Sequence, residues 1–386
     1  MKKKTIALSV LAVLAAGSSI APVYAGGVTY KDGEKYIKIG GRIQLQYHQA
    51  SPKDGATTSD LFFRRLRPYI EGSLHKNWKA KIQWDMGKAE GENELALKDA
   101  YFAYKGMKNM SVIIGNYSFP FSREFLTSSK YQQFVERTFS GDHNYGTPDR
   151  QMGIHLKGKA AGKKISWGAS LVRGAIDPDN KKLDLDTVAN KNADFNEGFM
   201  AGARIDWHPL GYMKMSQGDF KRKSKLTIGV AAYGWSNNNE NNTYTDSAGN
   251  ATSASKADIK DVTAYEVSAA YRGMGLSLDA EYNTFTSNTV VNGYNGGIYT
   301  NGSTKLTNAE IKGGYMFAKA VEIVAGYQTQ NADGYETRWN RTSVGVNWFL
   351  HKHDIKFQLT YRMGKNLKGV RDSDENETFL QGQYVF

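Results

Sequence analysis

Arginine and lysine recur at alternate positions in the first hundred residues, in a pattern suited to binding anions. Residues two or four positions apart share one face of an extended strand. The basic residues that share a face in this way are Lys38 and Arg42, Arg65 and Arg67, and Lys79 and Lys81. Arginine suits phosphate-like oxygens because its fork donates two parallel hydrogen bonds and keeps its charge at physiological pH. The pattern predicts a basic face that carries anion-binding groups.

The elements that would hold these residues are strands of alternating polarity, each about as long as a tilted membrane-spanning strand. In the run 353–364, Leu359 and Tyr361 share an apolar face, whereas Lys356 and Arg362 lie on the polar one. Sixteen such runs are predicted: 36–48, 60–75, 78–88, 96–105, 110–117, 150–158, 164–173, 198–208, 224–235, 260–272, 275–287, 306–317, 320–330, 337–350, 353–364 and 376–386.

The connections between these runs alternate between long and short. Most short ones have two to four residues, and the connection 209–223 is an overlong member of that set. Long outer loops and short periplasmic turns are typical of antiparallel transmembrane barrels. The predicted fold is therefore all-β: a transmembrane antiparallel β-barrel of sixteen strands. The long loop 118–149 is aromatic and mixed in charge, and we expect it to fold into the lumen as a constriction. The alternative is an ordinary surface loop.

Both ends of the chain indicate export to a bacterial outer membrane. Residues 1–25 combine a basic start, a short apolar stretch and small residues before Gly26, which predicts a cleaved signal peptide. The expected mature barrel is 26–386. Its last residues alternate in polarity and end on Phe386, as the closing strands of outer-membrane barrels do. Such a barrel would contact outer-membrane lipid and lipopolysaccharide.

Composition narrows the function further. The formal charge is +12, and the chain has no cysteine. A basic surplus suggests nucleic acid, anionic lipid or an anionic solute as partner. Export disfavours nucleic acid, and the spread of charge along alternating strands favours a solute. No Gly-x-Ser-x-Gly or His-Glu-x-x-His motif occurs, so we predict no enzyme activity, no metal site and no cofactor.

Three stretches, 60–72, 97–104 and 114–129 with its continuation to 137, resemble the phosphate-selective porin O/P family of outer-membrane channels. The resemblance implies a homotrimeric, sixteen-stranded porin that passes small anions such as phosphate. The paired arginines of that family's second strand match Arg64 and Arg65, and its inward-loop arginine matches Arg137. Residue 123 is arginine where the family more usually has an apolar residue.

The candidate pore-lining residues are thus Lys38, Arg42, Arg64, Arg65, Arg67, Lys79, Lys81 and Arg137. Alternation sends Arg65 inward but Arg64 outward, so Arg64 either lies near the rim or is turned by a β-bulge. These arginines could instead contact lipopolysaccharide phosphates or pair with Glu71 and Asp85. The runner-up function is a general or cation-preferring porin in which inward acids such as Asp99 and Asp279 dominate. An outer-membrane enzyme or an adhesin is the least favoured function.

Overall fold

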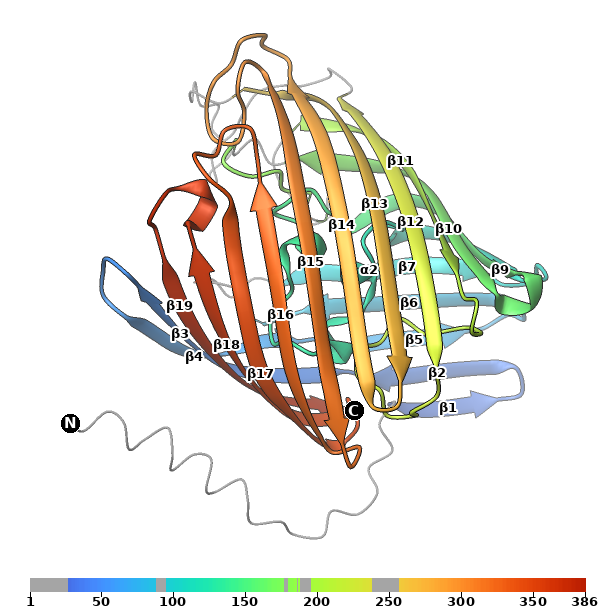
Figure 1. Cartoon of the computed structure of the whole chain (residues 1–386). Coiled ribbons are helices and arrows are strands. Elements are labelled where there is room, and N and C mark those ends of the chain that lie inside the picture. The colour runs from blue at the N-terminus through green and yellow to red at the C-terminus, as the bar shows by residue number, and fades with distance from the viewer. Residues whose placement is uncertain (1–26, 88–94, 177–179, 186, 188–195, 238–256) are drawn as a thin grey trace.

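The computed structural model describes residues 27–87, 95–176, 180–185, 187, 196–237 and 257–386 (Figure 1). The predicted signal peptide lies outside these residues. In the described part of the chain, nineteen strands form one sheet, and their mutual pairings are antiparallel. None of the described helices is long and apolar enough to cross a membrane.

From β5 onward, each strand pairs with the next one along the chain. They are β1 (Val28–Asp32), β2 (Lys35–Gly40), β3 (Arg42–Pro52), β4 (Thr58–Leu66), β5 (Tyr69–Ser73), β6 (Trp78–Asp85), β7 (Ala96–Tyr104), β8 (Met110–Ser118), β9 (Arg150–Ala160), β10 (Ile165–Ile176), β11 (Asn196–Trp207), β12 (Lys225–Asn237), β13 (Ile259–Gly273), β14 (Leu276–Thr289), β15 (Ser303–Phe317), β16 (Val321–Asn331), β17 (Trp339–His351), β18 (Ile355–Lys365) and β19 (Glu375–Val385). The last strand, β19, pairs with β3.

Each of the sixteen predicted runs contains a strand, but the strand count differs from sixteen. The run 36–48 is divided into β2 and β3, which pair with β5 and β4 respectively. The run 60–75 is divided into β4 and β5 at Pro68, which has no N–H to donate to a ladder. The short strand β1 precedes the first predicted run. Sixteen spanning strands therefore remain a prediction.

The short connections are tight hairpin turns. Only Met274 and Gly275 separate β13 from β14, and their φ angles of 55° and 90° are both positive. Two-residue turns of this kind match the right-handed twist of the flanking strands, and glycine adopts the required conformation without a steric cost. Such turns hold consecutive strands in strict antiparallel register.

The sheet buries polar side chains and exposes apolar ones. In β18, Lys356 and Thr360 are fully buried, whereas Leu359 and Tyr361 are each 39% exposed. A water-soluble sheet has the opposite arrangement, because apolar side chains leave water most readily. The predicted alternation is therefore present, with the apolar face outward, as a lipid-facing surface requires.

The segment 118–149 lies within the curve of the sheet, where Figure 1 places α2 (Arg123–Leu126). It also contains the short 3-10 helices η1 (Ser129–Tyr131) and η2 (Phe139–Gly141). Two further 3-10 helices, η3 (Ala161–Lys163) and η5 (Leu367–Gly369), lie in other connections. The Phe125 N–H donates to Ser122 Oγ at 3.0 Å and caps α2.

Aromatic side chains attach this segment to one side of the sheet. Phe119 and Phe121 are fully buried, and their rings lie 5.9 Å and 4.9 Å from the ring of Tyr233 on β12. Phe121 also packs against Phe285 on β14, at 5.8 Å. The apolar residues of the segment are therefore buried against the polar face of the sheet, beside β12 and β14.

The outward apolar face generates a stability prediction. Replacing Leu359 with arginine should reduce the free energy of folding into lipid bilayers by about 2–4 kcal/mol, because an arginine near the bilayer centre is costly to place on the lipid face. Folding into liposomes at graded urea concentrations measures this change. The control, Leu359→Met, conserves volume and polarity and should cost under about 1.5 kcal/mol. An equal loss in both variants would contradict a lipid-facing position.

Candidate anion-binding constriction

A cavity of about 570 Å³ lies between the inward segment 118–149 and the sheet strands β2, β3, β5 to β9 and β19. Its basic lining residues are Lys38, Arg42, Arg67, Lys81, Lys130 and Arg150. Its acidic lining residues are Glu71, Asp99 and Asp354, and four tyrosines, Tyr69, Tyr101, Tyr117 and Tyr131, complete the polar wall. Basic groups outnumber acidic ones two to one, so the cavity has a positive formal charge.

Half of the residues predicted from sequence line this cavity. Lys38, Arg42, Arg67 and Lys81 are among its lining residues. Lys79 is close by and forms an ion pair with Glu71. The other three predicted residues, Arg64, Arg65 and Arg137, do not line the cavity.

Three of the six cations in the wall are neutralised by a carboxylate. Arg67 Nε lies 2.5 Å from Asp85 Oδ2, the pairing that the sequence left open as an alternative. Lys81 and Arg150 share Asp99, at 2.5 Å and 2.6 Å. These groups therefore contribute little net charge to the cavity.

The other three cations of the cavity wall are not neutralised in this way. Among the described residues, no carboxylate forms an ion pair with Lys38, Arg42 or Lys130. Arg42 is 6% exposed, donates to Ser128 Oγ at 3.1 Å, and leaves its Nε without a partner. Lys130 Nζ lies 4.9 Å from the centre of the Tyr131 ring. The positive charge of these three residues is therefore not compensated by a carboxylate of the described chain.

A β-bulge explains the position of Arg64. Gln44 pairs with Arg65 and Leu45 with Phe63, so Arg64 is the extra residue in β4. Its Nε donates to Glu136 Oε1 at 2.7 Å, and Arg65 lies 3.8 Å from the same carboxylate. The bulge therefore turns both arginines towards the inward segment, as one of the two alternatives expected. Burial alone would raise the pKa of Glu136, but the two arginines outweigh it and hold that pKa well below its usual value.

Arg137 binds the inward segment itself. Its Nη2 donates to the Phe125 and Thr127 carbonyls at 3.1 Å and 3.3 Å. Its guanidinium carbon lies 5.4 Å from the Phe125 ring centre. Arg137 thus stabilises the fold of the segment. The sequence analysis expected Arg137 to line the pore, but this residue does not face the cavity.

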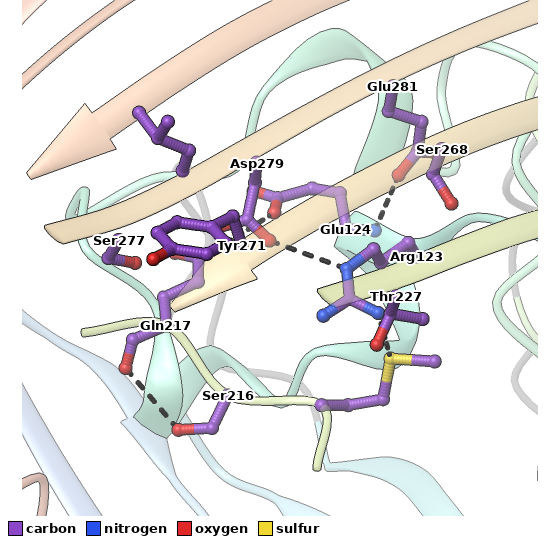
Figure 2. A network of polar contacts seen from close by, with 12 residues as sticks. Arg123, Glu124, Ser216, Gln217, Thr227, Ser268, Tyr271, Ser277, Asp279 and Glu281 are labelled. Atoms are coloured by element: carbon purple, nitrogen blue, oxygen red, sulfur yellow. Dashed lines mark hydrogen bonds and ion pairs between the residues drawn. The ribbon is translucent and has the colours of Figure 1, made fainter. Parts of the chain in front are cut away.

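The tip of the segment is fixed to the opposite wall by charged groups (Figure 2). Arg123 Nε lies 3.4 Å from Asp279 on β14, and the Glu124 N–H donates to Glu281 at 2.7 Å. Lys312 on β15 lies 2.5 Å from Glu124. Arg123, the residue at which the sequence differs from the usual family pattern, is therefore a wall contact.

The overlong connection 209–223 supplies a support that sequence reasoning missed. Gln217 is 1% exposed, and its amide group donates to Glu124 Oε2 at 2.8 Å and accepts from the Gln133 N–H at 2.7 Å. Its backbone N–H donates to the Tyr131 carbonyl at 3.0 Å. Gln217 thus joins both halves of the inward segment. Its only sequence signal is the unusual length of the connection.

Comparison with known proteins gives a consistent family. The family described as "Phosphate-selective porin O and P" matches residues 37–386. Porin O of Pseudomonas aeruginosa is 31% identical over 127 residues, which cover 31% of this chain and 29% of Porin O. The chain thus matches less than a third of the length of that relative.

Solved structures share the fold at low identity. The anion-selective porin from Comamonas acidovorans superposes with a TM-score of 0.62 and 13% identity, over 92% of this chain and 100% of that one. The trimer form of OmpT from Vibrio cholerae gives 0.57 and 12%, over 91% and 99%. Together with the family match across residues 37–386, these likenesses identify the chain as an outer-membrane β-barrel protein that belongs to the phosphate-selective porin O and P family.

Proposed function

We propose that the chain forms a water-filled channel through which small anions, phosphate among them, diffuse passively across the outer membrane. The observation that carries this proposal is the cluster of Lys38, Arg42 and Lys130, which line the cavity without an ion-pair partner among the described residues. The selectivity of a water-filled pore depends on its width and on its fixed charges. An anion that enters this cavity would meet uncompensated positive charge.

The proposal includes the architecture around the cavity. Residues 1–25 would be removed as a signal peptide, and 26–386 would form a barrel of sixteen spanning strands, closed by the pairing of β19 with β3. The segment 118–149 would act as the constriction loop, because it forms one wall of the cavity. Lipid and lipopolysaccharide would surround the apolar outer face.

A second candidate function is a general, cation-preferring porin. Glu71, Asp99 and Asp354 line the same cavity. Glu71 and Asp99 already pair with lysine or arginine, and Asp354 lies 3.6 Å from His351. The uncompensated groups are therefore mainly cations, which favours anion passage.

The decisive experiment measures ion preference in planar bilayers. A salt gradient should give a reversal potential that indicates preference for chloride over potassium, and millimolar phosphate should reduce the chloride current. Arg42→Gln should raise the phosphate concentration needed for half-inhibition about tenfold, since it removes one charge-assisted hydrogen bond worth about 1.5 kcal/mol. The matched control is Arg338→Gln, an exposed residue outside the cavity, which should leave the current unchanged. A cation-preferring wild-type channel would support the second candidate function.

A further prediction concerns the support of the constriction loop. Gln217→Ala should increase single-channel conductance and current noise, because the Gln133 N–H loses its side-chain acceptor, the Glu124 carboxylate loses one of its donors, and the loop is held less firmly. Ser216→Ala is the neighbouring control, since its hydroxyl makes only a 3.3 Å bond to the Gln217 carbonyl. A folded Gln217→Ala channel with wild-type conductance and noise would show that the loop does not need this support.

We also propose a homotrimer, as the OmpT trimer has a similar fold. Protein extracted in mild detergent should have the mass of three chains by light scattering, and should yield trimers on brief cross-linking. A single-chain mass at micromolar concentration would contradict this assembly.

A further inference from the structure

The short connections gather exposed basic residues at one end of the sheet. Because neighbouring strands are antiparallel, alternate connections lie at the same end. The exposed lysines and arginine there, which we term the basic ring, are Lys31, Lys35, Lys76, Lys105, Lys108, Lys163, Lys164, Lys214, Lys221, Arg222, Lys223, Lys319 and Lys352. They come from seven connections and so are distributed around this end of the sheet.

Very few acids oppose this charge. The exposed acids of the same connections are Asp32 and Glu34, and Glu34 lies 3.7 Å from Lys76. Asp219 is 3% exposed and accepts the N–H groups of Arg222 and Gly275, so its carboxylate is used within the connection. The basic ring therefore keeps a large positive surplus.

Apolar side chains adjoin the basic ring on the outer face of the sheet. Trp78 is 44% exposed and follows Lys76 by two positions, and Phe317, 47% exposed, precedes Lys319 by two. Near the end of β17, Leu350 is 42% exposed and precedes Lys352 by two. Exposed aromatic residues mark the boundary between hydrocarbon and headgroups in membrane barrels. Lysines just beyond that boundary can extend to lipid phosphates.

Two of the connections that carry several basic residues are in contact with each other. Lys163 and Lys164 lie on the turn between β9 and β10, and the connection 209–223 carries Lys221, Arg222 and Lys223. The two connections touch, because the His208 N–H donates to the Lys164 carbonyl at 2.7 Å. Trp207, 51% exposed, lies beside them on the outer face.

We infer that the basic ring binds the phosphates of anionic phospholipid headgroups in the membrane leaflet at the short-turn end of the barrel. The combination of a circumferential ring and an adjoining apolar band favours a lipid surface over a soluble acidic protein, which would need a positive patch free of hydrocarbon contact. Each basic residue close to an anionic surface adds to the attraction, and the effect weakens with salt. Binding at this ring is independent of ion selectivity at the cavity.

Lipid retention by the purified barrel tests this inference. Detergent-solubilised protein is incubated with equal amounts of phosphatidylglycerol and phosphatidylcholine, gel-filtered, and the co-eluting lipid is quantified by mass spectrometry. Wild-type protein should enrich phosphatidylglycerol about fivefold at low salt, the factor expected from one effective lysine contact, and less at about 0.5 M salt. The variant K163Q/K164Q/K221Q/K223Q should bring the ratio close to one.

The matched control removes four exposed lysines from the opposite end, as K53Q/K260Q/K305Q/K368Q. This control should keep the wild-type enrichment, and heat-modifiable gel migration confirms that both variants are folded. An equal loss in both variants, or no enrichment in the wild type, overturns the inference. Binding of polyglutamate by wild-type protein that shows no lipid preference would also overturn it and assign the ring to a soluble acidic partner.

Discussion

Neutralisation of charge on the polar face of the sheet is the constraint on which the rest of this structure depends. Arg204 on β11 illustrates it: its side chain is 2% exposed and lies 2.7 Å from Glu266 and 2.8 Å from Asp206. A charge buried without a partner costs several kcal/mol, whereas a paired and hydrogen-bonded charge can be held at little net cost. Basic residues on this face therefore need acids within reach, here one on the same strand and one on β13, two strands away.

The inward segment also provides partners for charged side chains on the polar face of the sheet. Its backbone carbonyl at Phe121 accepts from Arg204 at 2.6 Å, and its Glu136 accepts from Arg64 on the other side of the molecule. The segment thus gives Arg64 its carboxylate partner and Arg204 a further acceptor, and these contacts hold it in place. Its aromatic residues add apolar burial on the β12 side, so the open cavity is displaced towards β2 to β9.

Much of the fold could be predicted from sequence because the alternation of polarity extends over nearly the whole chain. The sixteen runs found by that pattern all contain strands. Pro68 divides one of these runs into two strands, and the neighbours that each of the two strands joins depend on pairing between strands. Pairing between strands also decides the contacts that the sequence left open for the candidate site residues. Alternation predicts the face on which a side chain lies only as far as the β-bulge, so it places Arg64 on the wrong face. No local sequence pattern shows that Arg67 contacts Asp85, eighteen positions away. Gln217 lies on a connection without periodicity, so its contacts with the inward segment had no sequence signal beyond the unusual length of that connection.

The ion selectivity of the cavity depends on which of its charged residues are paired, and not only on how many there are. A count along the alternating strands treats Arg67 and Arg42 alike, but the first has a carboxylate 2.5 Å away and the second has only a serine hydroxyl and the protein interior around it. The cations without partners come from three separate places, β2, β3 and the inward segment. Lys130 contributes its charge only while that segment stays anchored through Glu124 and Gln217. The positive charge of the cavity therefore depends on the position of the inward segment, and contacts on the far wall keep the segment in that position.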